Sequence, residues 1–200
     1  MLNSSWEFQK QGFAYCRIHL YDWREGARTL MKSDLLTHSK DTNTVARYLR
    51  RKGYKNVFAA GHSFGGLTLL RVDTKLFNSL SLWDISSFKR YPPKKWVKQY
   101  KGARYLIGSY ELLLSARYEK GMINFPDEHK LASKIKIPTQ ICHASGREAL
   151  LEESSKLYYQ ALNCKKEIVA LKNTSHSFTE QGAIKSLVNR TATWFNKNLI

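Results

Sequence analysis

A glycine-flanked serine at residues 61–65 constrains this chain more than any other stretch. Residues 55–60 read as a short strand that enters the turn, and residues 65–71 read as the start of an apolar helix. A serine held in a sharp turn between a strand and a helix needs a strained backbone, and Gly61 and Gly65 leave room because they lack a β-carbon. The stretch therefore predicts a nucleophile elbow that lifts the Ser63 hydroxyl to the carboxyl edge of a sheet.

The same turn also predicts an oxyanion contact. The first amides of the helix point at the spot that the Ser63 hydroxyl occupies, so the backbone N–H of Phe64 is placed to stabilise a negatively charged oxygen. A simpler interpretation is a glycine-rich turn in which Ser63 only caps the helix, because serine is a favoured N-cap. The flanking strand and helix favour the elbow.

Length and composition indicate one folded domain. The chain has 200 residues, of which 42% are hydrophobic, enough for one sizeable core and short for two. The first seven residues show no basic region followed by an apolar run, as a secretory signal would, and no apolar stretch approaches a membrane span. Three cysteines without metal-ligand spacing suit a reducing interior. We therefore expect a cytoplasmic protein without cofactor or metal.

The net charge of +17 is the most unusual bulk property of the chain. A strongly basic protein can bind nucleic acid, an anionic membrane or an acidic substrate. Much of the charge is scattered, as on solvated surfaces, but residues 89–101 are basic, contain interleaved aromatic residues and include no acid. No nucleic-acid-binding motif accompanies them, so nucleic acid is the least favoured partner and an anionic substrate is a weak expectation.

Alternation along the chain predicts an α/β fold, a mostly parallel sheet with helices on both faces. Strands are expected at residues 13–20, 55–60, 76–83, 137–142 and 167–171, and helices at residues 4–11, 41–52, 65–71, 151–162 and 181–198. The alternation stops between residues 85 and 134, where two prolines and a helical stretch at 104–117 predict an inserted helical lid. The lid separates a first part of the core, residues 1–84, from a second part, residues 135–200.

Three further segments carry a family resemblance. Residues 21–26 look like an Asp-x-Arg-Gly turn, residues 136–139 are similar to an Ile-x-x-Pro strand lead, and residues 173–178 match a Gly-His-x-Phe loop with Ser175 where glycine is usual. With the elbow, they make almost the whole chain resemble the α/β-hydrolase superfamily. The nearest branches are single-domain esterases and serine-aminopeptidase-like enzymes.

The resemblance implies a serine nucleophile and a histidine partner. Ser63 would attack, and His176 would act first as general base and then as acid, because a serine hydroxyl is a poor nucleophile until a neighbouring imidazole takes its proton. His176 could instead be an ordinary loop or core histidine. His62, inside the turn, is expected to point away from the hydroxyl and to line the sheet.

The acid of such a triad has two candidates. The family usually places an aspartate shortly after its seventh strand, but residues 143–148 of this chain contain none. Asp84, at the end of the strand at 76–83, and Glu148, just beyond the usual place, are the substitutes. Asp84 is slightly favoured because Trp83 and the apolar run before it would bury the pair and strengthen its hydrogen bond. Asp84 could equally be an N-cap or a lid anchor.

A second departure concerns the family's third strand and its His-Gly loop, which supply the second oxyanion donor. Nothing in this chain corresponds to them. The chain could be a fragment of a longer protein, its start could be assigned too late, or residues 13–20 could pair directly with the elbow strand. Loss of one oxyanion donor costs about 10² to 10³ in turnover. Without that third strand, the elbow strand would have an unpaired edge, which is also compatible with self-association.

The sequence is compatible with three functions. The first is a serine hydrolase that cleaves a carboxylic ester, thioester or small amide through an acyl-enzyme. The second is a non-catalytic or truncated α/β-hydrolase relative that serves as a binding or scaffold module, and the third is a basic nucleic-acid-binding protein. In the first, aromatic lid residues would either shape the substrate pocket or form the lid core. These residues are Tyr91, Trp96, Tyr100, Tyr105 and Tyr110.

Overall fold

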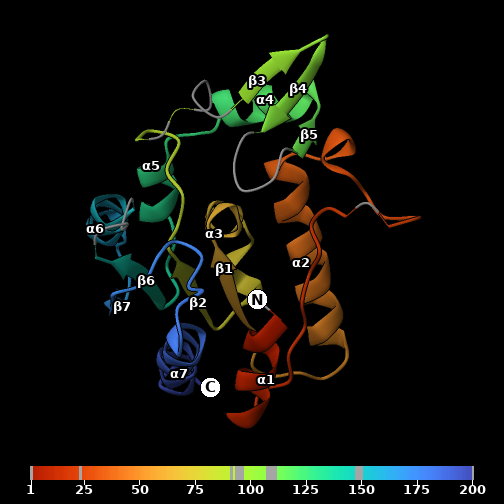
Figure 1. The fold of residues 1–200 in the computed structure, drawn as a ribbon. Coiled ribbons are helices and arrows are strands. Elements are labelled where there is room, and N and C mark those ends of the chain that lie inside the picture. Colours follow the sequence, from red (N-terminus) through yellow and green to blue (C-terminus); the bar gives the residue numbers. More distant parts are fainter. Residues whose placement is uncertain are drawn as a thin grey trace.

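A four-stranded parallel sheet forms the centre of the molecule (Figure 1). The computed structural model describes residues 2–22, 24–90, 92, 97–106, 112–146 and 151–199. The sheet has the order β1-β2-β6-β7, and its strands are β1 (Phe58–His62), β2 (Ser79–Trp83), β6 (Thr139–Ser145) and β7 (Lys166–Lys172). All five residues of β2 and the first six of β6 are buried, the pattern of strands covered on both faces of a parallel sheet.

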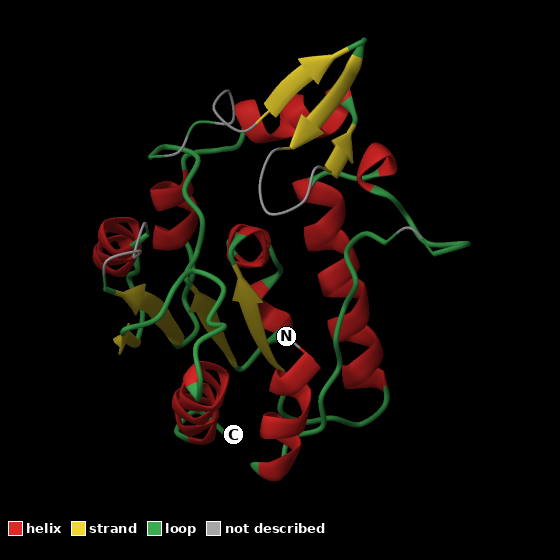
Figure 2. Ribbon diagram, in the orientation of Figure 1, coloured by secondary structure: helices red, strands yellow, loops and turns green. Residues whose placement is uncertain are grey.

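Helices cover both faces of this sheet, as the sequence predicts (Figure 2). They are α1 (Leu2–Lys10), α2 (Leu35–Arg51), α3 (Phe64–Leu69), α6 (Glu152–Ala161) and α7 (Ala183–Asn196). On one face, α2, α3 and α6 contribute to an apolar core that includes Leu80, Leu82 and Ile141. On the other, α1 and α7 pack against a second core that includes Trp83 and Cys142. Adjacent residues of a strand thus point into opposite cores.

The predicted strand at residues 13–20 is wrong. The structure assigns no strand there, and β1 pairs only with β2 in the described part of the chain. The Phe13 ring packs edge-on against Phe58 at 6.0 Å, and further along the Tyr21 ring stacks on His38 of α2 at 6.2 Å. Alternate apolar side chains such as Phe13 and Tyr15 are therefore half-buried by packing without a backbone ladder, so the alternating pattern does not make a paired strand.

The lid is mixed rather than helical. It contains an antiparallel sheet of β3 (Val97–Tyr100), β4 (Ala103–Leu106) and β5 (Leu112–Leu114), followed by α4 (Ala116–Ile123) and α5 (Glu128–Ser133). The predicted helix over residues 104–117 is wrong, because residues 104–106 belong to β4 and residues 112–114 to β5. Lys101 and Gly102 both have positive φ, 47° and 78°, which is the two-residue hairpin turn that joins β3 to β4.

The lid packs on the N-terminal end of α2. Its buried residues Val97, Leu114 and Tyr118 share a cluster with Leu30 of the short 3-10 helix η1 (Leu30–Lys32) and with Leu35. The Asp34 carboxylate accepts hydrogen bonds from the Thr37 backbone and from Arg117 Nε at 2.7 Å, so one side chain caps α2 and holds α4. Among the described helices, none is long and apolar enough to cross a membrane.

Candidate active site

The serine turn joins β1 directly to α3. Ser63 lies between the two elements with φ 56° and ψ −118°, a backbone conformation that is strained for a residue with a β-carbon. A β-carbon on Gly61 would lie 2.5 Å from the carbonyl oxygen of Gly65, closer than atoms pack. One on Gly65 would meet nothing within 4 Å, whereas one on Gly66 would lie 2.8 Å from Ile85. Gly61 provides the expected room, but the second tight position is Gly66, not Gly65.

A continuous chain of hydrogen bonds runs from this serine through a histidine to a buried carboxylate. Ser63 Oγ lies 3.0 Å from His176 Nε2, and His176 Nδ1 lies 2.6 Å from Asp84 Oδ2. Asp84 is 1% exposed, and its other oxygen accepts a hydrogen bond from the Ala144 backbone at 3.1 Å. An ionised carboxylate only accepts hydrogen bonds, so Nδ1 carries the imidazole proton and Nε2 is free to accept the proton of Ser63.

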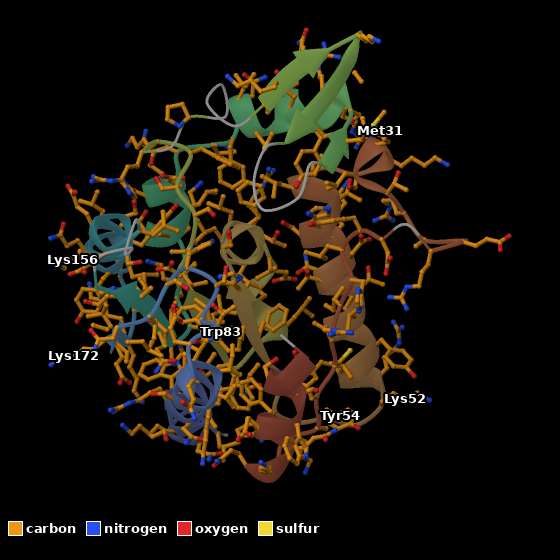
Figure 3. All side chains as sticks on the ribbon, viewed as in Figure 1. Met31, Lys52, Tyr54, Trp83, Lys156 and Lys172 are labelled. Atoms are coloured by element: carbon orange, nitrogen blue, oxygen red, sulfur yellow. The ribbon has the colours of Figure 1, made fainter. Side chains whose placement is uncertain are left out.

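The topology of the sheet explains why these residues meet. Ser63 follows β1, Asp84 follows β2 and His176 lies in the loop after β7, and the carboxyl ends of parallel strands share one edge of a sheet. Trp83, labelled in Figure 3, packs on the α7 side and donates from Nε1 to Thr191 at 3.0 Å. The alternative acid Glu148 lies outside the described residues. Asp84 lies within hydrogen-bond distance of His176.

His62 supports the histidine loop. Its Nε2 lies 2.7 Å from the backbone carbonyl oxygen of His176, and its ring centroid is 4.7 Å from the His176 ring. Burial, and to a lesser degree the neighbouring His176, lowers the pKa of His62 to about 4. The ring is therefore neutral at pH 7, with the proton on Nε2 donated to the carbonyl. Sequence reasoning placed His62 away from the serine but gave no sign that it would hold the opposite loop.

The free energy of unfolding is expected to fall as the pH drops from 6.5 to 4. The pKa of His62 is 6.5 in the unfolded chain and about 4 in the folded one, so the unfolded chain binds more protons in this window. The stability is present above pH 6.5 and is lost toward pH 4, by about 3 kcal/mol at 1.36 kcal/mol per unit of pKa. Burial also lowers the pKa of His38, which acts in the same direction.

Urea unfolding at pH 7 and pH 4.5 tests this expectation. His62→Gln should lose less stability between the two pH values than the wild type, because glutamine keeps an N–H donor and does not titrate. His19→Gln, which changes an exposed histidine, should retain the wild-type dependence. An unchanged pH dependence in His62→Gln would show that His62 is not the group responsible.

Sequence reasoning missed a second hydroxyl beside the serine. Ser86 Oγ lies 2.9 Å from Ser63 Oγ, and the Ser86 side chain is 3% exposed. Ser86 follows Asp84 by two residues on the chain that leaves β2. No motif marks it, because its proximity depends on how residues 84–88 turn over the start of α3.

The lid contributes an apolar cavity near this site. The cavity has a volume of about 360 Å³, and its walls include Phe88, Met122, Phe125 and Pro126. The Phe88 ring lies 5.5 Å from the ring of Phe64, the residue next to the serine, and 5.4 Å from the Phe125 ring. Phe88 therefore lines the cavity and also packs against Phe64 of the elbow.

The five aromatic lid side chains expected to shape the pocket or form the lid core lie outside the described part of the structure. Tyr91, Trp96 and Tyr110 lie outside the described residues, as do the side chains of Tyr100 and Tyr105. Among the described residues, no three His, Cys, Asp or Glu side chains are grouped as a metal ion would require.

Solved structures with the same architecture identify the fold. The esterase domain of a Rhodothermus marinus protein superposes with a TM-score of 0.77 at 13% identity, covering 100% of this chain and 80% of the other. The chain has the α/β-hydrolase fold. Est1E of Butyrivibrio proteoclasticus, solved with ferulic acid bound, shares this fold with a TM-score of 0.70 at 14% identity, covering 88% of this chain and 73% of Est1E.

Two further comparisons concern a lipase structure and a family model. A monoacylglycerol lipase of Paleococcus ferrophilus has a TM-score of 0.62 at 16% identity, over 86% of this chain and 79% of the lipase, and has the same α/β-hydrolase fold. The family model described as PhoPQ-activated pathogenicity-related protein matches residues 103–199. No curated protein matches the sequence.

Proposed function

We propose that this protein is a serine hydrolase that cleaves a carboxylic ester, thioester or small amide through an acyl-enzyme. The observation that carries the proposal is the hydrogen-bond chain from Ser63 through His176 to the buried Asp84. The fold supports it, since similar structures include an esterase domain and a monoacylglycerol lipase.

The proposed reaction follows from the positions of the protons. His176 Nε2 takes the Ser63 proton while Oγ forms a bond to the carbonyl carbon, and the carbonyl electron pair moves to oxygen. The new oxyanion accepts a hydrogen bond from the Phe64 N–H, and the Asp84 carboxylate stabilises the imidazolium. Collapse expels the leaving group, which takes the proton from His176, and water then releases the acid by the same steps.

The substrate proposal uses the lid cavity. A cavity of about 360 Å³ with a largely apolar lining suits a small acyl or aromatic group, and one of its lining residues, Phe88, packs on Phe64 beside Ser63. The preference for an anionic substrate remains a prediction, because residues 93–96 of the basic segment lie outside the described residues. Within the described part, Lys89 already pairs with Asp127 at 3.2 Å.

Labelling with a fluorophosphonate probe tests the proposed function. An activated serine attacks the phosphorus and displaces fluoride, so peptide mass spectrometry should find one adduct, on Ser63. Ser63→Ala should give no adduct, and His176→Gln should slow labelling by at least about 10⁴-fold, because the members of such a unit act together. Ser133→Ala, on α5, should label at the wild-type rate. A folded wild-type protein that forms no adduct would favour the non-catalytic binding module instead.

A further inference from the structure

Among the described residues, two side chains hydrogen-bond the Ser63 hydroxyl, and they are His176 and Ser86. The Oγ of Ser86 is 2.9 Å from Ser63 Oγ, and its backbone N–H points at the Ser63 carbonyl oxygen at 3.4 Å. The side chain is buried, with 3% of its surface exposed. A buried hydroxyl that contacts a nucleophile directly can stabilise negative charge that develops beside it, because a hydrogen bond is stronger in a low-dielectric interior.

The direction of this hydrogen bond follows from the rest of the chain. His176 Nδ1 donates to Asp84, so Nε2 must accept, and the single proton of Ser63 is committed to it. Ser63 Oγ can then only accept from Ser86. The Ser86 hydroxyl is therefore the donor, and its proton points into the reacting centre.

Two buried side chains fix the segment that carries Ser86. Tyr158 donates its hydroxyl proton to the Ser86 carbonyl oxygen at 2.9 Å, and burial raises the pKa of Tyr158, so the phenol keeps that proton. Glu128, which is 2% exposed, accepts hydrogen bonds from the Ser87 hydroxyl and from the Phe88 N–H at 3.1 Å. Donors held in place before the reaction stabilise a transition state without having to reorganise.

The segment also lies on the helix side of the nucleophile. Ile85 packs so closely on Gly66 that a β-carbon there would lie 2.8 Å from its side chain. Residues 85–86 therefore cross the first turn of α3, which begins at Phe64, the proposed first oxyanion donor. His176 approaches Ser63 from the loop after β7, a different part of the sheet edge.

We propose that Ser86 is a further catalytic residue, whose hydroxyl donates to Ser63 Oγ in the free enzyme and to the substrate oxyanion in the tetrahedral intermediate. The oxyanion and Ser63 Oγ are bonded to one carbon at that stage, so a small rotation of the hydroxyl transfers the hydrogen bond from one oxygen to the other. Ser86 keeps its proton throughout. It would supply a second oxyanion donor beside the Phe64 N–H. This inference rests on the proposed serine-hydrolase function.

Ser86→Ala tests the proposal with p-nitrophenyl acetate as substrate. Loss of one oxyanion donor should lower kcat about 10² to 10³-fold with little change in KM. The affinity for a trifluoromethyl ketone, which forms a tetrahedral oxyanion with the serine, should fall by a similar factor. Ser79→Ala is the matched control, because it removes a buried hydroxyl from the start of β2, the strand that precedes Ser86, at a site remote from the nucleophile. Thermal unfolding verifies that both variants fold.

Two results would overturn the role of Ser86. One is a kcat in Ser86→Ala equal to that of Ser79→Ala. The other is a lower kcat with unchanged affinity for the trifluoromethyl ketone, since an oxyanion donor must contribute to both. Failure of the proposed function has a different signature, because the wild type itself would then form no fluorophosphonate adduct.

Discussion

Replacing Asp84 with asparagine is expected to lower kcat about 10⁴-fold, as the equivalent change does in serine proteases. The physical reason is the tautomer of His176. Asp84 Oδ1 accepts from the Ala144 N–H at 3.1 Å, so the oxygen of an asparagine would remain there and its NH₂ group would face Nδ1. A donor at that place forces the imidazole proton to Nε2, which then cannot accept the proton of Ser63.

The measurement is kcat with p-nitrophenyl acetate, together with a thermal unfolding curve that shows the variant is folded. Asp73→Asn is the control, because Asp73 is an exposed residue that caps a short 3-10 helix and lies outside the site. It should retain wild-type kcat. A kcat for Asp84→Asn within about tenfold of the wild type would contradict the role of Asp84 and favour Glu148 as the acid of the triad.

Gly61→Ala is expected to destabilise the fold by about 3 kcal/mol, the upper end of the range for overpacking. The added carbon would lie 2.5 Å from the oxygen and 2.6 Å from the carbon of the Gly65 carbonyl. Both atoms belong to the backbone of the elbow, which cannot yield without moving Ser63. Activity should therefore fall with stability.

Gly65→Ala is the matched control for this prediction, and urea unfolding is the measurement. A β-carbon at Gly65 would meet nothing within 4 Å, and Gly65 lies within α3, where alanine is favoured over glycine by up to about 1 kcal/mol. Its free energy of unfolding should be unchanged or higher. Equal losses in the two variants would mean that the elbow relaxes around either carbon.

The parts of the fold that the sequence predicts well are those with strong local signals. Gly61 and Ser63 mark a strand, a turn and a helix within a few residues, and the turn geometry requires them. Asp84 and His176 each follow a strand, and parallel strands bring such positions to one edge of the sheet. The proximity of these side chains was therefore predictable, although their catalytic roles stay a proposal.

The failures have a common physical cause, which is that tertiary contacts decide the outcome. Residues 13–20 alternate like a strand, yet Phe13 packs on Phe58 and Tyr15 on Phe8 of α1 without a partner ladder. Residues 104–117 read as a helix, yet the hairpin turn at Lys101 and Gly102 folds β4 back on β3, and β5 then pairs with β4. Ser86 approaches Ser63 only because Tyr158 and Glu128 hold its segment, and no sequence spacing encodes that.

The position of β1 in the sheet has a dynamic consequence. Val57 O accepts a hydrogen bond from Asn78 N, just before β2, and Ser63 N donates to Trp83 O of β2. The backbone groups of Phe58, Ala60 and His62 therefore face the other way, where the described residues place no strand. The strand that carries the serine is thus held by a single ladder. We therefore expect its local opening to require less free energy than global unfolding, which amide hydrogen exchange of β1 would measure. On the proposed function, we expect the fraction of molecules with an intact elbow to follow that local equilibrium rather than the melting temperature of the whole domain.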